Sequence, residues 1–478
     1  MENKELINKL LNAKIPFTEV QSVTYDCSDN YKEFYFGDKS YNFYRVDLKS
    51  VYEEGSLVYT TVWLPESFNG CLAAFGNGGM AGGFYYWDLV NFTSKGFVSV
   101  HTDMGTSGGR ERGINNPAVW RDFGWRSTHG MAVLGKALCE IGFGKAPDYS
   151  YFLGGSTGGQ QAFSLAQRFP TDFNGIVAGV PANNRIALHT YFLWNHNHLR
   201  KPDGSVMFSA FEIEKINRLA VEFFQNKSDG EKGDDFVSYP RRDDETIAEL
   251  IEIISNNGFN IEQCEALRAV YQGPVDPKTG KQIYNGMPIG SEIYGCGLKD
   301  CQDPESPHYY PFIWCFGDNY NPYDFDFSDD YKRLRETLSD DMDSNNPDLT
   351  AFYEQGGKIL VYSGSADPCV PYPDAEGYCN RMFDLMGIDK AQEFFRFYLL
   401  PGKDHGNGGR GANREWGNET GEKSLFMLIK DWCEQGVAPN EIYAARVVDN
   451  KTEFVRKVYP YGSEQNPIKP HTKVCEIF

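Results

Sequence analysis

Short apolar runs alternate with amphipathic stretches along the first 180 residues of the chain. The runs are rich in β-branched and aromatic side chains, which is typical of buried strands. Five such runs predict strands at residues 57–65, 71–77, 97–103, 149–155 and 175–181. Apolar side chains at helical spacing predict helices over residues 127–143 and 158–170, before and after the fourth strand. Strands that alternate with helices indicate a parallel sheet in an α/β fold.

This alternation stops near residue 185 and returns near residue 350. The intervening sequence is polar, charged and aromatic, without a βαβ pattern. Beyond it, the pattern predicts strands at 358–364 and 393–402 and a helix over 421–436. We therefore expect one α/β catalytic domain built from residues 1–185 and 351–478, interrupted by an inserted lid domain at 186–350.

The net charge and the length of the apolar runs exclude several classes of partner. The net charge is −20. A negatively charged protein is repelled by the phosphates of nucleic acid and anionic lipid, so neither is expected as a partner. No apolar run reaches the roughly 18 residues that a membrane span needs. The first residues predict an amphipathic helix rather than a signal peptide, so the chain is expected to be cytoplasmic, or secreted if a leader was removed. The sequence carries no signal for an oligomeric state.

The 11 cysteines are scattered, which favours thiols in a reducing compartment. Cys296 and Cys301 come nearest to a pair but lack the further ligands that a zinc site requires.

The pattern Gly-x-Ser-x-Gly occurs twice, around Ser107 and around Ser156. In a chain with 49 glycines among 478 residues, such a pattern is expected by chance about 0.3 times, so its context has to decide. A predicted strand precedes Ser156 and a predicted helix follows it, as in the nucleophile turn of α/β-hydrolases. Ser107 leads into a charged stretch with no helical face. Ser156 is therefore the candidate nucleophile, and a turn serine is the alternative.

A serine nucleophile needs a histidine base and a carboxylate to orient that base, in the chain order Ser, Asp or Glu, His. Asp367 follows the predicted strand 358–364, with Asp374 as the second choice and a turn-capping role as the alternative. His405 follows the strand 393–402 in a glycine-rich loop, whereas His471 lies in a polar tail. His129 precedes Ser156, and we interpret it as structural.

The oxyanion that forms during acyl transfer requires preorganised N–H donors. We expect one from Thr157, at the start of the helix after Ser156, and the second from Gly78 or Gly79 in a loop after an earlier strand. No GxxxxGK[ST] pattern follows this glycine-rich loop, so it does not predict nucleotide binding.

The chain resembles the tannase and feruloyl esterase family, whose members are α/β-hydrolases with a large inserted lid. The resemblance is carried, in family order, by the segments FGNGGMAGG, HTDMGTSGG, FGWRSTHGMAVLGKAL, YSYFLGGSTGGQQAFSLAQRFPTDFNGIVAGVPANN, YQGPVDPKTGKQIYNGMPIGSE, YSGSADPCVPY and LPGKDHGNGGRG. It implies an α/β-hydrolase fold with Ser156 as nucleophile, Asp367 as acid and His405 as base.

Two departures accompany the resemblance. Family members usually carry a disulfide between cysteines next to the nucleophile and the histidine, but Gly155 and Gly406 stand here. The family's lid often holds a structural calcium, and the matching loop offers oxygen ligands, with a solvated acidic loop as the alternative. The candidate calcium ligands are Asn226, Asp229, Asp234 and Asp235. No cofactor is expected for catalysis.

The resemblance implies a small-molecule aromatic ester as substrate, with a galloyl or hydroxycinnamoyl group. Tyr309, Tyr310, Phe312, Trp314 and Phe316 could stack on a phenolic ring, with Trp314 and Phe316 as the candidate contacts, or could form the lid's own core. Two alternatives stay open: a serine hydrolase of non-phenolic esters or peptides, and a non-catalytic binding protein on the same scaffold.

Overall fold

A computed structural model describes residues 4–201, 203–227, 231, 233–240, 242–302 and 309–468. The chain packs as two compact units, each made of several segments. Unit 1 comprises residues 1–183, 313–318 and 338–359, and unit 2 comprises residues 184–312, 319–337 and 360–478. Of the described residues, none belongs to a helix with the length and apolar character needed to cross a bilayer.

A mixed sheet forms the centre of unit 1, with the strand order β1-β2-β3-β5-β4-β6-β7. Strands β1, β2, β3 and β5 pair antiparallel, and β5, β4, β6 and β7 pair parallel. The strands are β1 Thr18–Cys27, β2 Asn42–Ser50, β3 Val58–Pro65, β4 Cys71–Phe75, β5 Val98–Thr102, β6 Tyr149–Gly155 and β7 Gly175–Gly179. Every residue of β4, β5 and β7 is buried, as expected for strands covered on both faces.

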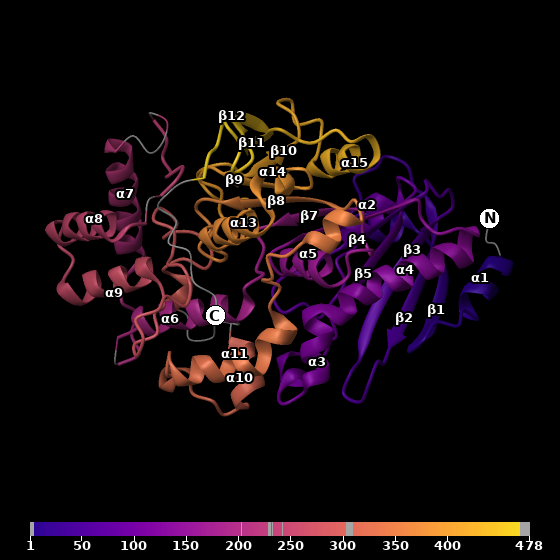
Figure 1. The fold of residues 1–478 in the computed structure, drawn as a ribbon, viewed down its shortest axis with the longest axis horizontal. Coiled ribbons are helices and arrows are strands. Elements are labelled where there is room, and N and C mark those ends of the chain that lie inside the picture. The colour runs from indigo at the N-terminus through magenta and orange to yellow at the C-terminus, as the bar shows by residue number, and fades with distance from the viewer. Residues whose placement is uncertain are drawn as a thin grey trace. The chain divides into compact units, whose positions relative to one another are not determined.

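Helices cover this sheet (Figure 1). The long helix α4 lies against β5 and α5 lies against β6 and β7. Met131, Leu134 and Leu138 of α4 are at most 2% exposed, and Gly144 ends the helix in the left-handed conformation. The helices of unit 1 are α1 Lys4–Leu11, α2 Tyr86–Thr93, α3 Pro117–Arg121, α4 Ser127–Phe143, α5 Thr157–Arg168 and α12 Thr350–Glu354.

Unit 2 combines a helical insertion with the C-terminal part of the chain. Helices α7, α8 and α9 pack in succession, and α6 packs on α9 (Figure 1). The helices of the insertion in unit 2 are α6 Arg185–His198, α7 Ala210–Asn226, α8 Asp244–Asn256 and α9 Ile261–Gln272. Two more helices have residues in both units, α10 Tyr310–Phe316 and α11 Asp329–Met342.

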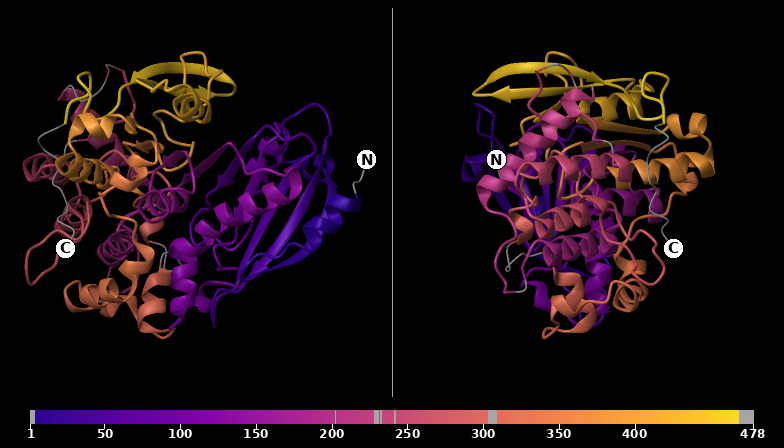
Figure 2. Two further views of the ribbon diagram at one scale, coloured as in Figure 1. Left: turned by 45° about the vertical axis from the view of Figure 1, so that its right-hand side comes forward. Right: turned by 90° about the vertical axis from the view of Figure 1, so that its left-hand side faces the viewer.

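The C-terminal part of unit 2 supplies two neighbouring strands and a small antiparallel sheet. Strand β8 begins at the edge of unit 1 and hydrogen-bonds to β9, and β10, β11 and β12 form the separate sheet seen in yellow in Figure 2. Asp449 and Asn450 turn the β11–β12 hairpin with positive φ, which Asp and Asn tolerate. The elements are β8 Lys358–Gly364, α13 Pro373–Met386, α14 Ile388–Gln392, β9 Phe395–Leu400, β10 Arg414–Trp416, α15 Leu425–Gln435, β11 Ile442–Val448 and β12 Lys451–Val458.

The fold confirms the predicted α/β-hydrolase class. Each predicted strand and helix has a counterpart within a few residues, and α4 matches the predicted helix residue for residue. The antiparallel strands β1 and β2 were not expected. The packing units divide the chain differently from the predicted domains, because residues 360–478 pack with the insertion. The domain boundaries at 185 and 350 stay a prediction.

Candidate active site

Ser156 lies on a sharp turn between β6 and α5, in unit 1. Its φ of 60° and ψ of −115° are rare for an L residue and cost on the order of 1–3 kcal/mol. Two backbone hydrogen bonds hold the turn: Ser156 N–H donates to Gly179 O at 2.9 Å, and Ala182 N–H donates to Ser156 O at 3.1 Å. A sharp, strained turn between a strand and a helix is the geometry expected of a nucleophile turn, and the role of Ser156 stays a prediction.

Glycines allow three backbone segments to meet beneath this turn. A Cβ added at Gly76 would lie 2.6 Å from Gly158 Cα and 3.0 Å from Gly154 Cα. A Cβ added at Gly154 would lie 2.7 Å from Gly158 O. Because these obstacles are backbone atoms, they cannot move aside as a side chain would, so the end of β4 packs against the turn only without side chains at these positions.

The candidate oxyanion loop lies beside Thr157. Thr157 Oγ1 donates to Gly79 O at 2.6 Å, and Gly158 N–H donates to Asn77 O at 2.8 Å. Asn77 N–H in turn donates to Oε1 of Gln161 in α5, also at 2.8 Å. These bonds fix the Gly78–Gly79 segment against the start of α5, where the N–H groups of a helix favour negative charge.

The segment around Ser107, the second Gly-x-Ser-x-Gly match, contacts the glycine-rich loop after β4. Ser107 lies in a turn that is fixed by Asp103, whose Oδ1 accepts the N–H groups of Tyr59 and Gly105 at 2.9 Å each. Thr106 Oγ1 donates to Met80 O at 2.7 Å. Since Ser107 precedes no helix of the kind that follows Ser156, the structure agrees with its interpretation as a loop serine.

Asp367 and His405 form a hydrogen-bonded pair in unit 2. His405 Nδ1 lies 2.8 Å from Asp367 Oδ2, and the other carboxylate oxygen accepts the N–H groups of Cys369 at 2.8 Å and Val370 at 2.9 Å. Asp367 is fully buried, whereas the His405 side chain is 26% exposed. With Nδ1 directed at the carboxylate, Nε2 is the ring nitrogen on the side away from Asp367.

The loop that carries His405 is fixed by several contacts rather than by a disulfide. The Lys403 ammonium donates to Gly406 O at 3.0 Å and to Asn407 Oδ1 at 3.1 Å. Arg410 reaches the insertion, where it donates to Asn217 Oδ1 and to Glu214 Oε2 at 3.1 Å each. A Cβ at Gly364 would lie 2.1 Å from Lys403 O, so a glycine at the end of β8 allows the Asp367 turn and the His405 loop to touch.

The environment of His405 favours its protonated form. Burial opposes protonation, but the charge of Asp367 and the hydrogen bond from His405 to it outweigh burial, and together with Cys296 and Asp404 they raise the pKa of His405 to about 8. A histidine held in this way can accept a proton and stabilise the resulting imidazolium, which is what a general base in acyl transfer requires.

The other carboxylate and histidine candidates lie elsewhere. Asp374 is 3% exposed in the first turn of α13 and accepts a hydrogen bond from Asn184 at 3.2 Å. His129 Nδ1 lies 2.7 Å from Asp172 Oδ2, and its ring stacks on Phe169. His471 lies outside the described residues.

The aromatic residues proposed for the lid serve mainly as packing. Trp314 is fully buried in unit 1, where its indole N–H donates to Arg110 O at 2.6 Å and its ring meets Phe123 edge to face. Tyr310 and Phe312 are at most 2% exposed, while Phe316 is half-buried. A substrate contact for Trp314 or Phe316 stays a prediction, and the burial of Trp314 favours the core alternative.

The predicted calcium ligands do not converge on a cation site in the described part of the chain. The Asp234 carboxylate binds the Arg456 guanidinium through both oxygens, at 2.6 and 2.8 Å. Asn226 and Asp235 are exposed, and Asp229 lies outside the described residues. Among the described residues, no three His, Cys, Asp or Glu side chains are arranged to hold a metal ion. Calcium binding stays a prediction, and one of the predicted ligands, the Asp234 carboxylate, already binds Arg456.

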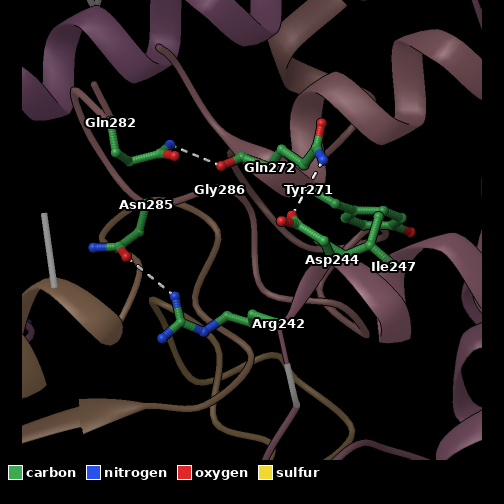
Figure 3. Close-up of a pocket in the computed structure, with 8 residues that line it drawn as sticks. All are labelled: Arg242, Asp244, Ile247, Tyr271, Gln272, Gln282, Asn285 and Gly286. Carbon is green, nitrogen blue, oxygen red and sulfur yellow. Dashed lines mark hydrogen bonds between the residues drawn. The ribbon is translucent and has the colours of Figure 1, made fainter. Parts of the chain in front are cut away.

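A small pocket in the insertion is polar and lacks a nucleophile (Figure 3). Arg242 donates to Asn285 Oδ1 at 3.2 Å, and Gln272 donates to Asp244 Oδ1 at 3.3 Å. The lining residues are Arg242, Asp244, Ile247, Tyr271, Gln272, Gln282, Asn285 and Gly286. This composition offers hydrogen bonds but no serine, cysteine or histidine, so it is not the candidate active site.

The strand–turn–helix at Ser156 and the Asp–His pair after later strands define the chain as an α/β-hydrolase. Comparison with known proteins gives the family. The family model described as "Tannase and feruloyl esterase" matches residues 48–301 and 318–467. The chain belongs to the tannase and feruloyl esterase family and is a carboxylic ester hydrolase.

Relatives and solved structures agree with this assignment. The probable feruloyl esterase B-2 of Aspergillus terreus is 28% identical over 86% of this chain and 81% of its own length. The feruloyl esterase C of Talaromyces stipitatus is 27% identical over 89% and 83%. The crystal structure of feruloyl esterase B from Aspergillus oryzae superposes with a TM-score of 0.81 at 23% identity, covering 98% of both chains. Tannin acyl hydrolase from Aspergillus niger gives 0.77 at 19% identity, covering 96% of this chain and 92% of its own.

The relatives also correct one expectation. Fungal feruloyl esterases of this family are generally secreted, so the prediction of a cytoplasmic enzyme, drawn from the first residues of the chain, is wrong.

The glycine contacts beneath Ser156 generate a prediction. Gly76→Ala should lower the melting temperature, by an overpacking cost of about 2 kcal/mol, and should reduce ester hydrolysis by roughly tenfold or more because the turn is displaced. Gly83→Ala is the matched control, since a Cβ there meets nothing within 4 Å. Thermal unfolding and kcat/KM of both variants provide the measurement, and wild-type values for Gly76→Ala would contradict the close approach.

Proposed function

We propose that Ser156, His405 and Asp367 act together as a catalytic triad that hydrolyses carboxylic esters of aromatic acids. The hydrogen bond between His405 Nδ1 and Asp367 Oδ2, at 2.8 Å, is the observation that carries the proposal. It supplies an oriented base with a raised pKa, and the strained turn at Ser156 supplies a hydroxyl in the conformation of a nucleophile.

In the proposed reaction, His405 Nε2 accepts the proton of the Ser156 hydroxyl while Oγ attacks the ester carbonyl. The Thr157 amide and an amide of Gly78 or Gly79 stabilise the oxyanion. His405 then donates its proton to the leaving alcohol, which leaves an acyl group on Ser156. A water molecule that His405 deprotonates hydrolyses the acyl-enzyme and restores the serine.

The identity of the acyl group rests on the relatives. Feruloyl esterases and a tannin acyl hydrolase match most of the chain, which supports hydroxycinnamoyl or galloyl esters as substrates. A small-molecule ester follows from the family itself.

One prediction concerns the nucleophile and the acyl group. Ser156→Ala should lower kcat/KM by about 10⁴-fold or more and abolish labelling by a fluorophosphonate. Ser107→Ala, which changes the other copy of the motif, should retain both. Rates on methyl ferulate, methyl gallate, simple aryl acetates and peptides separate the substrate classes. Equal or higher rates on the acetates or peptides would reject the phenolic assignment, and labelling that survives in Ser156→Ala would reject the nucleophile.

The pH dependence of kcat/KM should report His405. Below its pKa of about 8 the imidazole is protonated and cannot accept the serine proton, so activity should rise with pH through a midpoint near 8 and then level off. Asp367→Asn removes the charge that raises this pKa, so its midpoint should move to lower pH while the plateau falls by roughly 10⁴-fold. Asp374→Asn is the control. An unchanged midpoint in Asp367→Asn would contradict the proposed pairing during catalysis.

The triad also requires the Ser156 turn to meet the His405 loop, and two glycines allow a test. A Cβ at Gly155 or at Gly406 meets only ordinary contacts, at 3.7 Å from Gly179 O and at 3.9 Å from Asp404 Oδ2. If the triad forms as proposed, the double variant Gly155→Cys/Gly406→Cys should form a disulfide under mild oxidation, because a disulfide needs Cα atoms roughly 4.4–6.8 Å apart.

Peptide mapping without reduction measures this cross-link. The pair Gly83→Cys/Gly406→Cys serves as the control and should not cross-link. If the 155–406 pair also stays unlinked while Ser156→Ala remains inactive, the serine is essential but the proposed meeting of the two loops is wrong.

A further inference from the structure

Three cysteines gather next to the Asp367–His405 pair, all within unit 2. The thiols of Cys296 and Cys369 hydrogen-bond to each other, and Cys301 Sγ donates to the backbone oxygen of Cys296 at 3.1 Å. Cys296 also acts electrostatically on the imidazole of His405. Segments separated by roughly 70 residues of chain thus bring two thiols into contact, the starting geometry for a disulfide.

Cys369 belongs to the turn that holds the catalytic carboxylate. Its N–H donates to Asp367 Oδ1 at 2.8 Å, and the carbonyl of the preceding Pro368 accepts a hydrogen bond from Tyr191 at 2.9 Å. The residue is 9% exposed. A covalent bond at this sulfur would therefore act directly on the backbone that orients Asp367.

Cys296 has an unusual backbone and is the more accessible of the pair. Its φ is +67°, a left-handed conformation that non-glycine residues rarely adopt and that tends to occur at functional positions. Its N–H donates to Asp300 Oδ2 at 2.8 Å, which helps to hold that conformation. The side chain is partly exposed, so a soluble reagent can reach it.

Metal binding and simple packing explain this cluster less well than a bond between the sulfurs. The described residues offer no group of three or more ligands that could hold a metal. Buried cysteines elsewhere, such as Cys139 in α4 and Cys379 in α13, show how this protein uses cysteine as a small apolar residue. Neither of those residues combines a positive φ with a thiol partner.

We propose that Cys296 and Cys369 are a modification site that forms a reversible disulfide, linking the turn that carries Asp367 to the segment around residue 296. The sulfur of Cys296 reacts first, and Cys369 resolves the intermediate.

The reaction is a thiol–disulfide exchange with a small-molecule disulfide such as oxidised glutathione. Cys296, as a thiolate, attacks one sulfur of the reagent, forming a mixed disulfide and releasing one thiolate. That thiolate takes up the proton lost from Cys296. Cys369 then attacks the Cys296 sulfur, releases the second small thiol with its proton and completes the protein disulfide. Two protein thiols are oxidised and one small disulfide is reduced to two thiols.

The order of attack follows from the surroundings of the two sulfurs. The hydrogen bond to Cys296 and burial raise the pKa of Cys369 well above its ordinary value, so Cys369 is a poor thiolate. Cys296 is partly exposed whereas Cys369 is buried, so a small disulfide reaches the sulfur of Cys296 first. His405 is faced by Asp367, Asp404 and Cys296, and disulfide formation removes the contribution of Cys296 to its raised pKa.

The test uses the full-length protein, treated with oxidised glutathione or with dithiothreitol, then alkylated and digested without reduction. We expect a linked peptide that contains Cys296 and Cys369 and two fewer alkylated thiols per chain. The melting temperature should rise by about 3 °C, because closing so long a loop restricts the unfolded chain. Dithiothreitol should reverse all three changes.

Cys296→Ser and Cys369→Ser should each lose the cross-link and the rise in melting temperature. Cys27→Ser, which changes another partly exposed cysteine, should keep both. A bridge between Cys296 and Cys301, a stable glutathione adduct on Cys296, or no linkage in the wild type would overturn the proposal. The wild-type result decides even if a serine variant fails to fold.

One further readout joins the cross-link to catalysis. Oxidation of the wild type should move the acid limb of its pH profile to lower pH. Oxidised Cys27→Ser, which keeps the cross-link, should show the same acid limb as the oxidised wild type. This readout rests on the proposed role of His405, whereas the linked peptide does not. A linked peptide with an unmoved limb would therefore retain the disulfide and reject its influence on the base.

Discussion

The close backbone approach beneath Ser156 is the constraint on which the turn of the proposed nucleophile depends. Gly76, Gly154 and Gly158 meet at distances that leave no room for a Cβ, and this contact brings the end of β4 to the start of α5. The glycine-rich loop after β4 then lies beside Thr157, and Ser156 takes up the strain of the turn. The backbone hydrogen bonds of Ser156 with Gly179 and Ala182 offset that strain.

A close backbone approach also shapes the Asp367–His405 pair in unit 2. Gly364 lets the end of β8 touch the backbone at Lys403, so the Asp367 turn and the His405 loop share one contact surface. Lys403 and Arg410 then fix the loop by hydrogen bonds and ion pairs, where the family resemblance implies a disulfide. Hydrogen bonds to charged groups are worth roughly 1.5–3 kcal/mol each, so several of them together can match a bridge whose removal typically costs 2–5 kcal/mol.

Local pattern explains what could be predicted from the sequence. The turn at Ser156 follows from an apolar run, two glycines and a helical stretch, and the choice of Asp367 and His405 follows from chain order. Strands β1 and β2 were missed because they lie in an aromatic, polar segment, where β1 alternates partly buried with exposed residues and β2 alternates buried with partly buried ones. The pairing of Asp234 with Arg456 joins residues far apart in the chain, and no local pattern signals that a guanidinium occupies a candidate calcium ligand. The thiol contact between Cys296 and Cys369 was invisible for the same reason.

The position of that thiol pair changes what a covalent bond near this site can do. Positions 155 and 406 belong to different packing units. A bridge between Cys296 and Cys369 joins two segments of unit 2 and leaves Ser156 outside the cross-linked region. It would stabilise the Asp367 turn against local unfolding and alter the electrostatics of His405, without fixing the distance over which the proton must pass. Orientation of the base and its approach to the serine are thus separate physical problems in this chain, and a covalent bond at the cysteines addresses only the first.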